Sequence, residues 1–204
     1  MVRDPIFTLT PLAELRPTQI TAGMREVKAK LRHWRSKHGT KAGEFLASHM
    51  IPVVLGPGER LYVIDHHHLA RALHEGGVKS IATTVTADLS RLDKDAFWVF
   101  LDNRGWMHPF DARGRRREYA EIPRSIVDLV DDPFRSLAGE LRRAGGFSKE
   151  TTPFSEFLWA DFLRRRIERK AVTQDFDRTL DKALKLARSH DADYLPGWCG
   201  PTEE

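Results

Sequence analysis

The sequence has almost no cysteine and no long apolar run. Of its 204 residues only Cys199 is a cysteine, which excludes an intramolecular disulfide framework and a zinc site built from several cysteines. No apolar stretch approaches the length of a membrane span, and residues 1–5 show no apolar core of a secretory signal. We therefore expect a cytoplasmic protein that makes no contact with a membrane.

A large excess of charge of one sign is also lacking. Lysine and arginine number 33 against 29 aspartates and glutamates, which gives a formal net charge of +4. Such a surface permits a polyanionic partner without requiring one. Because there is no internal repeat and no low-complexity segment, the length suits one core with a helical extension.

The most informative stretch is residues 61–73, which reads as a strand that runs into a helix. Residues 61–64 form an apolar run after the turn signal of residues 56–58, and His66, Leu69 and Leu73 recur at helical spacing. This pattern predicts that Asp65 is the N-cap of the helix and that His66 packs inward.

A helix that starts at this point offers a site for an anion. Its first backbone N–H groups have no intrahelical partner, and they carry the positive end of the helix dipole. The amides of His67 and His68 could therefore contact a phosphate. Arg71 lies one turn after His67 on the same face and could add a fixed positive charge.

These residues resemble a known family. Residues 65–72 read Asp-His-His-His-Leu-Ala-Arg-Ala and are similar to the Asp-Gly-His-His-Arg type of motif in the ParB-like/sulfiredoxin superfamily, whose strand-to-helix turn binds nucleotide phosphates. Residues 9–19 resemble the opening strand of that family and its arginine-proline turn. Residues 1–103 thus resemble a ParB-like nuclease domain. His66 stands where the broader motif has glycine, and Leu69 stands where it has arginine.

The resemblance and the hydrophobic patterns together predict an α+β fold. We expect a ParB/sulfiredoxin-like small mixed sheet with packed helices over residues 1–110, followed by an all-helical C-terminal extension over residues 111–204. A helix through residues 24–34 would be capped by Thr18 or Thr21. The other expected elements are a hairpin of residues 51–55 and 61–64, a strand over 80–87, a helix from Ser90 or Asp93 to Leu101, and helices over 123–130, 133–144, 155–170 and 173–190.

Glu26 has two interpretations. With Lys30 it forms an i, i+4 pair of the kind common on helix surfaces. The resemblance implies instead a general base, because kinases of the superfamily place a glutamate early in the domain.

The segment 102–110 also has two interpretations. Asp102, Arg104 and His108 could close over a ligand with Trp106 as a wall, or the segment could be a loop held by buried aromatic side chains. The basic run of residues 113–117 that follows is either solvated surface or a strip that binds phosphate.

Two further chemistries are disfavoured by the residues themselves. Adjacent helix positions differ by about 100° in direction, so three successive histidines cannot all face one ion, and we predict no metal site. Sulfiredoxin activity implies a cysteine just before the family's His-Arg pair, and none stands there.

Three functions remain, and whether the protein is an enzyme stays open. The first is phosphoryl transfer or nucleotide hydrolysis with ATP or ADP and Mg²⁺, through positioning and electrostatic stabilisation. The second is a ParB-like nuclease that acts on DNA phosphodiesters. The third is a non-catalytic, DNA-binding adaptor of the partition type. We favour the first, with a nucleotide as partner and DNA as a further candidate. Its predicted catalytic residues are Asp65, His67, His68 and Glu26, and its predicted phosphate-binding residues are His67, His68, Arg71 and Arg104.

Overall fold

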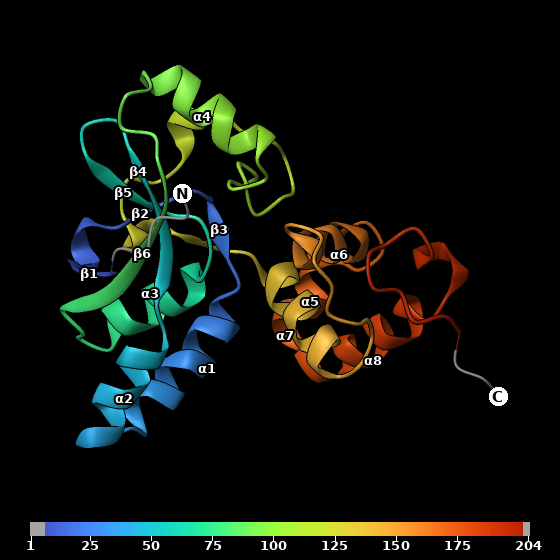
Figure 1. Cartoon of the computed structure of the whole chain (residues 1–204). Coiled ribbons are helices and arrows are strands. Elements are labelled where there is room, and N and C mark those ends of the chain that lie inside the picture. The colour runs from blue at the N-terminus through green and yellow to red at the C-terminus, as the bar shows by residue number, and fades with distance from the viewer. Residues whose placement is uncertain (1–6, 202–204) are drawn as a thin grey trace.

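The computed structural model describes residues 7–201, whose elements form two parts (Figure 1). The first part is a sheet with helices packed around it, and the second consists of helices α5 to α8. The predicted α+β class is confirmed. The bounds are β1 Phe7–Pro11, β2 Arg16–Pro17, β3 Thr21–Ala22, α1 Met24–Arg35, α2 Thr40–Ser48, β4 Ile51–Gly56, β5 Arg60–Val63, α3 His67–Glu75, β6 Ser80–Asp88, α4 Lys94–Asn103, β7 Val130–Asp131, α5 Pro133–Arg143, α6 Ser155–Arg164, α7 Arg169–Gln174 and α8 Phe176–Ala187.

The sheet is mixed, as expected. Its strand order is β1-β6-β4-β5-β2. The pairs β1/β6 and β4/β5 are antiparallel, whereas β6/β4 and β5/β2 are parallel. The hairpin of β4 and β5 and the strand β6 confirm the strand predictions for this part of the chain.

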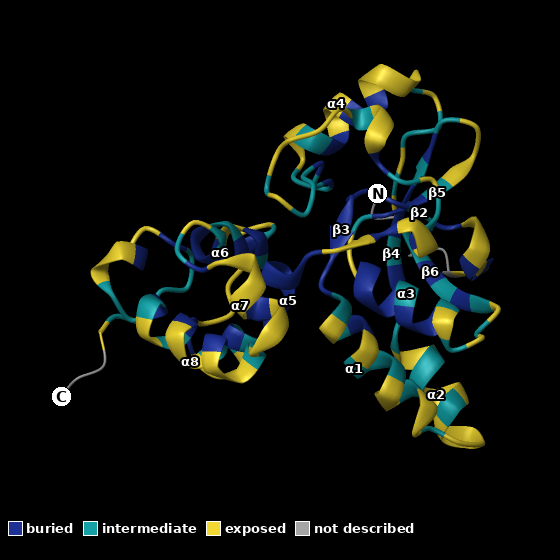
Figure 2. Cartoon of the chain, turned by 180° about the vertical axis from the view of Figure 1, so that it is seen from behind, coloured by how far each residue is buried: buried dark blue, intermediate teal, exposed yellow. Residues whose placement is uncertain are grey.

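The core of the first part lies between the sheet and α3. Leu69, Ala70 and Leu73 of α3 are at most 5% exposed and pack with Ile51 and Val53 of β4. Figure 2 shows buried residues in dark blue along α3 and the neighbouring strands. The helical spacing that was visible in the sequence therefore reports the packed face of α3.

Residues 119–131 pack against the first part. Ile126 and Leu129 join the core cluster of β4 and α3, and Ile122 joins a second cluster with Phe97 of α4. The helix predicted over residues 123–130 is wrong, because only a short 3-10 turn forms at 126–128 and β7 then pairs in parallel with β3. The predicted boundary after residue 110 stays a prediction.

The second part has its own core, in which Trp159 and Phe162 of α6 pack on Leu137 and Leu141 of α5. Asp132 caps α5 through the backbone N–H of Phe134 at 3.0 Å. The helix predicted over residues 155–170 divides into α6 and α7, and the helix predicted over 173–190 is α8, which the Asp175 side chain caps. Within residues 7–201 no helix combines the length and apolar character that a bilayer crossing needs.

Candidate functional site

The turn between β5 and α3 differs from the predicted capping geometry. The helix begins at His67, and the residue before it, His66, is left-handed with φ 64° and ψ 24°. The carboxylate of Asp65 accepts the backbone N–H of His66 at 2.6 Å and does not cap the helix. His66 is exposed and donates from Nδ1 to the carbonyl of Met50 at 3.2 Å. The predictions of Asp65 as N-cap and of an inward His66 are therefore wrong.

The physical reason lies in the backbone of residue 66. A left-handed conformation suits glycine and costs other residues about 1–2 kcal/mol. His66 stands where the broader motif has glycine, and it adopts the backbone shape that glycine adopts readily. The first-turn amides of His67, His68 and Leu69 have no acceptor among residues 7–201, so this turn leaves three N–H groups for a ligand.

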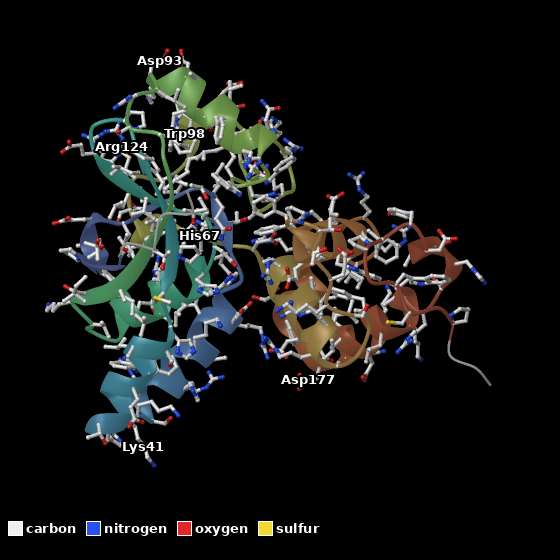
Figure 3. The ribbon with its side chains drawn as sticks, viewed as in Figure 1. Lys41, His67, Asp93, Trp98, Arg124 and Asp177 are labelled. Atoms are coloured by element: carbon white, nitrogen blue, oxygen red, sulfur yellow. The ribbon has the colours of Figure 1, made fainter. Side chains whose placement is uncertain are left out.

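The side chains of His67 and His68 point into the protein. They are 4% and 8% exposed. Nε2 of His67 accepts the N–H of Thr18 at 3.1 Å, and Nε2 of His68 accepts the N–H of Gly23 at 3.0 Å. The two imidazoles thus hold residues 18–23 against the start of α3, where Figure 3 labels His67.

The two rings are neutral. Burial lowers the pKa of His67 to about 3, and burial together with the charge of Arg135 places the pKa of His68 well below its usual range. A neutral ring can accept at Nε2, which both hydrogen bonds require. Since Nε2 is occupied in each ring, a phosphate contact by these two side chains stays a prediction, and their observed role is to position the backbone.

The start of α1 also differs from the prediction that Thr18 or Thr21 caps this helix. The Thr18 hydroxyl donates to the carbonyl of Val63 at 2.7 Å, and neither Thr18 nor Thr21 caps the helix. Gly23 is the N-cap, and a Cβ at this position would lie 2.9 Å from the backbone nitrogen of Ser136. The N-terminus of α1 therefore packs closely on α5.

Arg71 is engaged in contacts within the protein. Its Nε donates to Glu75 at 2.6 Å, and its Nη1 donates to the carbonyl oxygens of Ile126, at 3.2 Å, and Val127. These bonds tie α3 to the 3-10 turn at residues 126–128. The predicted role of Arg71 at a phosphate is untested, and its observed partners are structural.

The segment 102–110, which begins in the last turn of α4, does not bring its three polar side chains together. Asp102 contacts Arg116 and accepts the hydroxyl of Tyr119 at 2.8 Å. Arg104 is exposed at the end of α4, with its guanidinium 4.8 Å from the centre of the Trp106 ring. Arg104 shows no contact with the α3 turn in the described part of the chain, so its predicted role in phosphate binding is also untested.

Glu26 and His68 are the predicted catalytic side chains that the fold does bring together. Oε2 of Glu26 lies 3.7 Å from Nε2 of His68 and 3.5 Å from Nη1 of Arg135, and Oε1 lies 3.6 Å from Nζ of Lys30. The Glu26 side chain is 16% exposed. One carboxylate, two cations and a neutral imidazole thus meet where α1, α3 and α5 converge.

Sequence reasoning missed Arg135 and Glu156. Arg135 is 7% exposed and also lies 3.9 Å from Glu156 of α6, which pairs in turn with Arg142. A chain of ion pairs therefore crosses from α1 through α5 to α6. The available signal was the position of Arg135 on the apolar face of α5, three residues before Ala138, since a charged residue there almost always has a partner.

Among residues 7–201 no group of three or more His, Cys, Asp or Glu side chains is placed to hold a metal ion. The junction supplies a carboxylate that can accept a proton and cations that can hold an anion, and the start of α3 supplies backbone amides without an acceptor in the described part of the chain.

Comparisons with known proteins support the family resemblance. Residues 9–165 match the model of a family described as "Putative ParB-like nuclease". The chain is similar to protein Atu1540 from Agrobacterium tumefaciens, with a TM-score of 0.92 and 51% identity over 98% of this chain and 99% of that chain. The C-terminally truncated chromosome-partitioning protein ParB from Caulobacter crescentus, complexed with CTP-gamma-S, gives a TM-score of 0.34 and 13% identity over 91% and 94% of the two chains. No curated protein matches.

The left-handed turn predicts the effect of substitutions at residue 66. His66→Gly relieves the backbone strain and loses one hydrogen bond, so we expect the free energy of unfolding to change by less than about 1 kcal/mol. His66→Val places a β-branched residue at positive φ and should lower that free energy by about 1–3 kcal/mol. Urea denaturation measures both, and a valine variant as stable as the glycine variant would contradict the assigned geometry.

The buried histidines predict a pH dependence of stability. The unfolded chain binds a proton at His67 near pH 6.5, whereas the folded chain does so only near pH 3. The free energy of unfolding should therefore fall as the pH falls from 7 to 5, by about 2 kcal/mol from this residue. His67→Gln keeps an acceptor for Thr18 and should remove this share of the loss. The exposed His38→Gln is the matched control, and a His67 variant that loses stability as steeply as this control would refute the assignment.

Proposed function

Because the chain belongs to the ParB-like nuclease family, we propose that it binds the phosphate groups of a nucleotide at the start of α3 and catalyses phosphoryl transfer or hydrolysis. The observation that carries this proposal is the meeting of the Glu26, His68 and Arg135 side chains, since His68 belongs to the first turn of α3, whose amides have no acceptor among residues 7–201. A proton acceptor and groups that hold an anion lie together there, in a partly buried place where electrostatic interactions are stronger than in water.

Each residue at the start of α3 and at the Glu26 junction has a separate proposed role. The amides of His67, His68 and Leu69 bind phosphate oxygens, helped by the positive end of the α3 dipole. Arg135 and Lys30 offset the charge that develops as the phosphoryl group moves. Asp65 acts on the turn, because its carboxylate holds the N–H of His66.

Glu26 is the proposed general base. It takes the proton of a water or an acceptor hydroxyl, whose oxygen bonds to the terminal phosphorus as the bond to the bridging oxygen breaks and the shortened nucleotide leaves. His68 is a positioning residue, since it fixes Gly23 and with it the first turn of α1.

Magnesium fits this proposal as an ion carried by the nucleotide phosphates, whose charge it offsets. The described residues provide no set of three protein ligands for it. We therefore assign it no protein site, and no step above depends on one.

The first experiment measures the melting temperature with and without ATP, ADP and CTP, each with Mg²⁺. A ligand that binds only the folded state at about 100 times its Kd adds about 2.7 kcal/mol of stability, so at least one nucleotide should raise the melting temperature by several degrees. No shift with any of the three would contradict the phosphate site.

Substitution of Glu26 separates binding from chemistry. Glu26→Gln keeps the size of the side chain and removes the proton acceptor, so the melting shift should persist while the release of phosphate falls about 10²–10⁴-fold. The exposed Glu14→Gln is the matched control and should turn over like the unsubstituted protein. Equal turnover by the Glu26 and Glu14 variants would rule out the base, and cleavage of plasmid DNA by the same preparation would favour the nuclease alternative.

A further inference from the structure

Two basic segments that lie far apart in the sequence meet beside the second part of the fold. Residues 111–117 reach the end of α6 and the start of α7, where the carbonyl of Ala112 accepts a hydrogen bond from Arg169 at 3.1 Å. Gly114 has φ 73°, and a Cβ there would lie 2.6 Å from Nη1 of Arg164. A side chain at residue 114 would therefore clash with the arginine, and glycine permits the close approach.

The two segments enclose a groove of about 470 Å³ with an excess of positive charge. Its apolar lining includes Phe134 and Ile167, and Glu168 is its one acidic lining residue. The arginines that line it are Arg113, Arg164, Arg165, Arg166 and Arg169.

Only part of this positive charge is neutralised within the protein. Arg164 pairs with Asp132 at 2.6 Å, and Arg165 pairs with Asp161 at 2.8 Å. Arg113 and Arg169 form no ion pair within residues 7–201. Two arginines of the groove are thus free to bind an anion, and Arg169 is already oriented by its bond to a backbone carbonyl.

A second cavity of about 340 Å³ adjoins the groove and shares Arg164 and Arg165 with it. Its walls include Phe110, Phe154 and Phe157, together with Asp111, Asp132 and Asp161. Phe154 is left-handed, with φ 58°, a backbone conformation that is costly for a residue other than glycine.

His108 completes the aromatic wall. Its ring centre lies 3.9 Å from that of Phe157 and 4.6 Å from that of Phe110. Burial lowers the pKa of His108 to about 3, so the ring is neutral, and its nitrogens have no hydrogen-bond partner in the described part of the chain. The cavity thus offers aromatic surfaces and, on the His108 ring, one donor and one acceptor beside the charged side chains of its aspartates and arginines.

We infer that these adjoining cavities bind single-stranded nucleic acid, with phosphates on the arginines of the groove and a base among the phenylalanine rings. A positive groove beside aromatic side chains is the combination that holds unpaired strands, because every base has a face that can stack. A duplex fits this surface less well, since its bases are stacked inside the helix and cannot enter the aromatic cavity. This site is separate from the α3 turn and does not depend on the function proposed there.

The test measures the fluorescence anisotropy of two labelled ligands, an oligothymidylate of about 20 nucleotides and a duplex of equal length. This length exceeds the roughly 4–16 nucleotides that common single-strand binding sites cover. The single strand should bind at least about tenfold more tightly than the duplex. Equal affinities, or a preference for the duplex, would overturn the inference.

Variants separate the two contributions. Arg113→Ala with Arg169→Ala should weaken binding and reduce the slope of log K against log salt by about 1.4, since each lost phosphate contact removes about 0.7. Phe154→Gly removes a ring at a backbone conformation that glycine tolerates, and it should weaken binding about tenfold without changing the salt slope.

Arg178→Ala removes an exposed arginine of α8 that lines neither cavity, and it is the matched control. It should bind like the unsubstituted protein. Circular dichroism melting confirms that each variant is folded. A double arginine variant that binds as tightly as this control, or a Phe154 variant with full affinity, would refute the site.

Discussion

Two hydrogen bonds from backbone N–H groups to buried imidazoles determine the geometry on which the candidate site depends. His67 accepts from Thr18 and His68 accepts from Gly23. Both rings are neutral because burial disfavours their charged form. The loss of either acceptor would leave a backbone N–H unpaired inside the protein, which costs about 1–3 kcal/mol. Through Gly23 the second bond also sets the start of α1 and so the place of Glu26.

Much of the first part could be predicted from local patterns, and the capping details could not. The spacing of Leu69, Ala70 and Leu73 reports a packed helix face, and α3 packs as that spacing indicates. The roles of Asp65 and His66 depend on the left-handed backbone of residue 66, and the spacing of apolar residues cannot predict such a conformation. The glycine of the related motif was the available signal at residue 66. The helix predicted over residues 123–130 failed because β7 pairs with β3, a partner more than 100 residues away in the chain.

The candidate site was predictable only in part, for a related reason. The resemblance to the family directed attention to Glu26 and His68, and the fold brings them to 3.7 Å. Arg135 and Glu156 complete the ion-pair chain from helices whose spacing in the sequence gives no hint of contact with α1. The match to the family extends from residue 9 to residue 165, so it includes α5 and α6 with these two residues. Five residues keep their proposed roles as predictions: Asp65, His67, His68, Arg71 and Arg104. All of them except Arg104 make a contact that shapes the α3 turn or its surroundings.

The central claim is that the first-turn amides of α3 bind phosphate, and NMR spectroscopy of ¹⁵N-labelled protein tests it most directly. Inorganic pyrophosphate is a suitable probe, because it carries the phosphate groups of a nucleotide without its base or sugar. Titration should shift the amide signals of His67, His68 and Leu69 more than those of the rest of the chain, and it should saturate. If these three signals stay in place while the probe is added, or if the shifts gather on the arginine groove instead, the α3 turn is not the phosphate site.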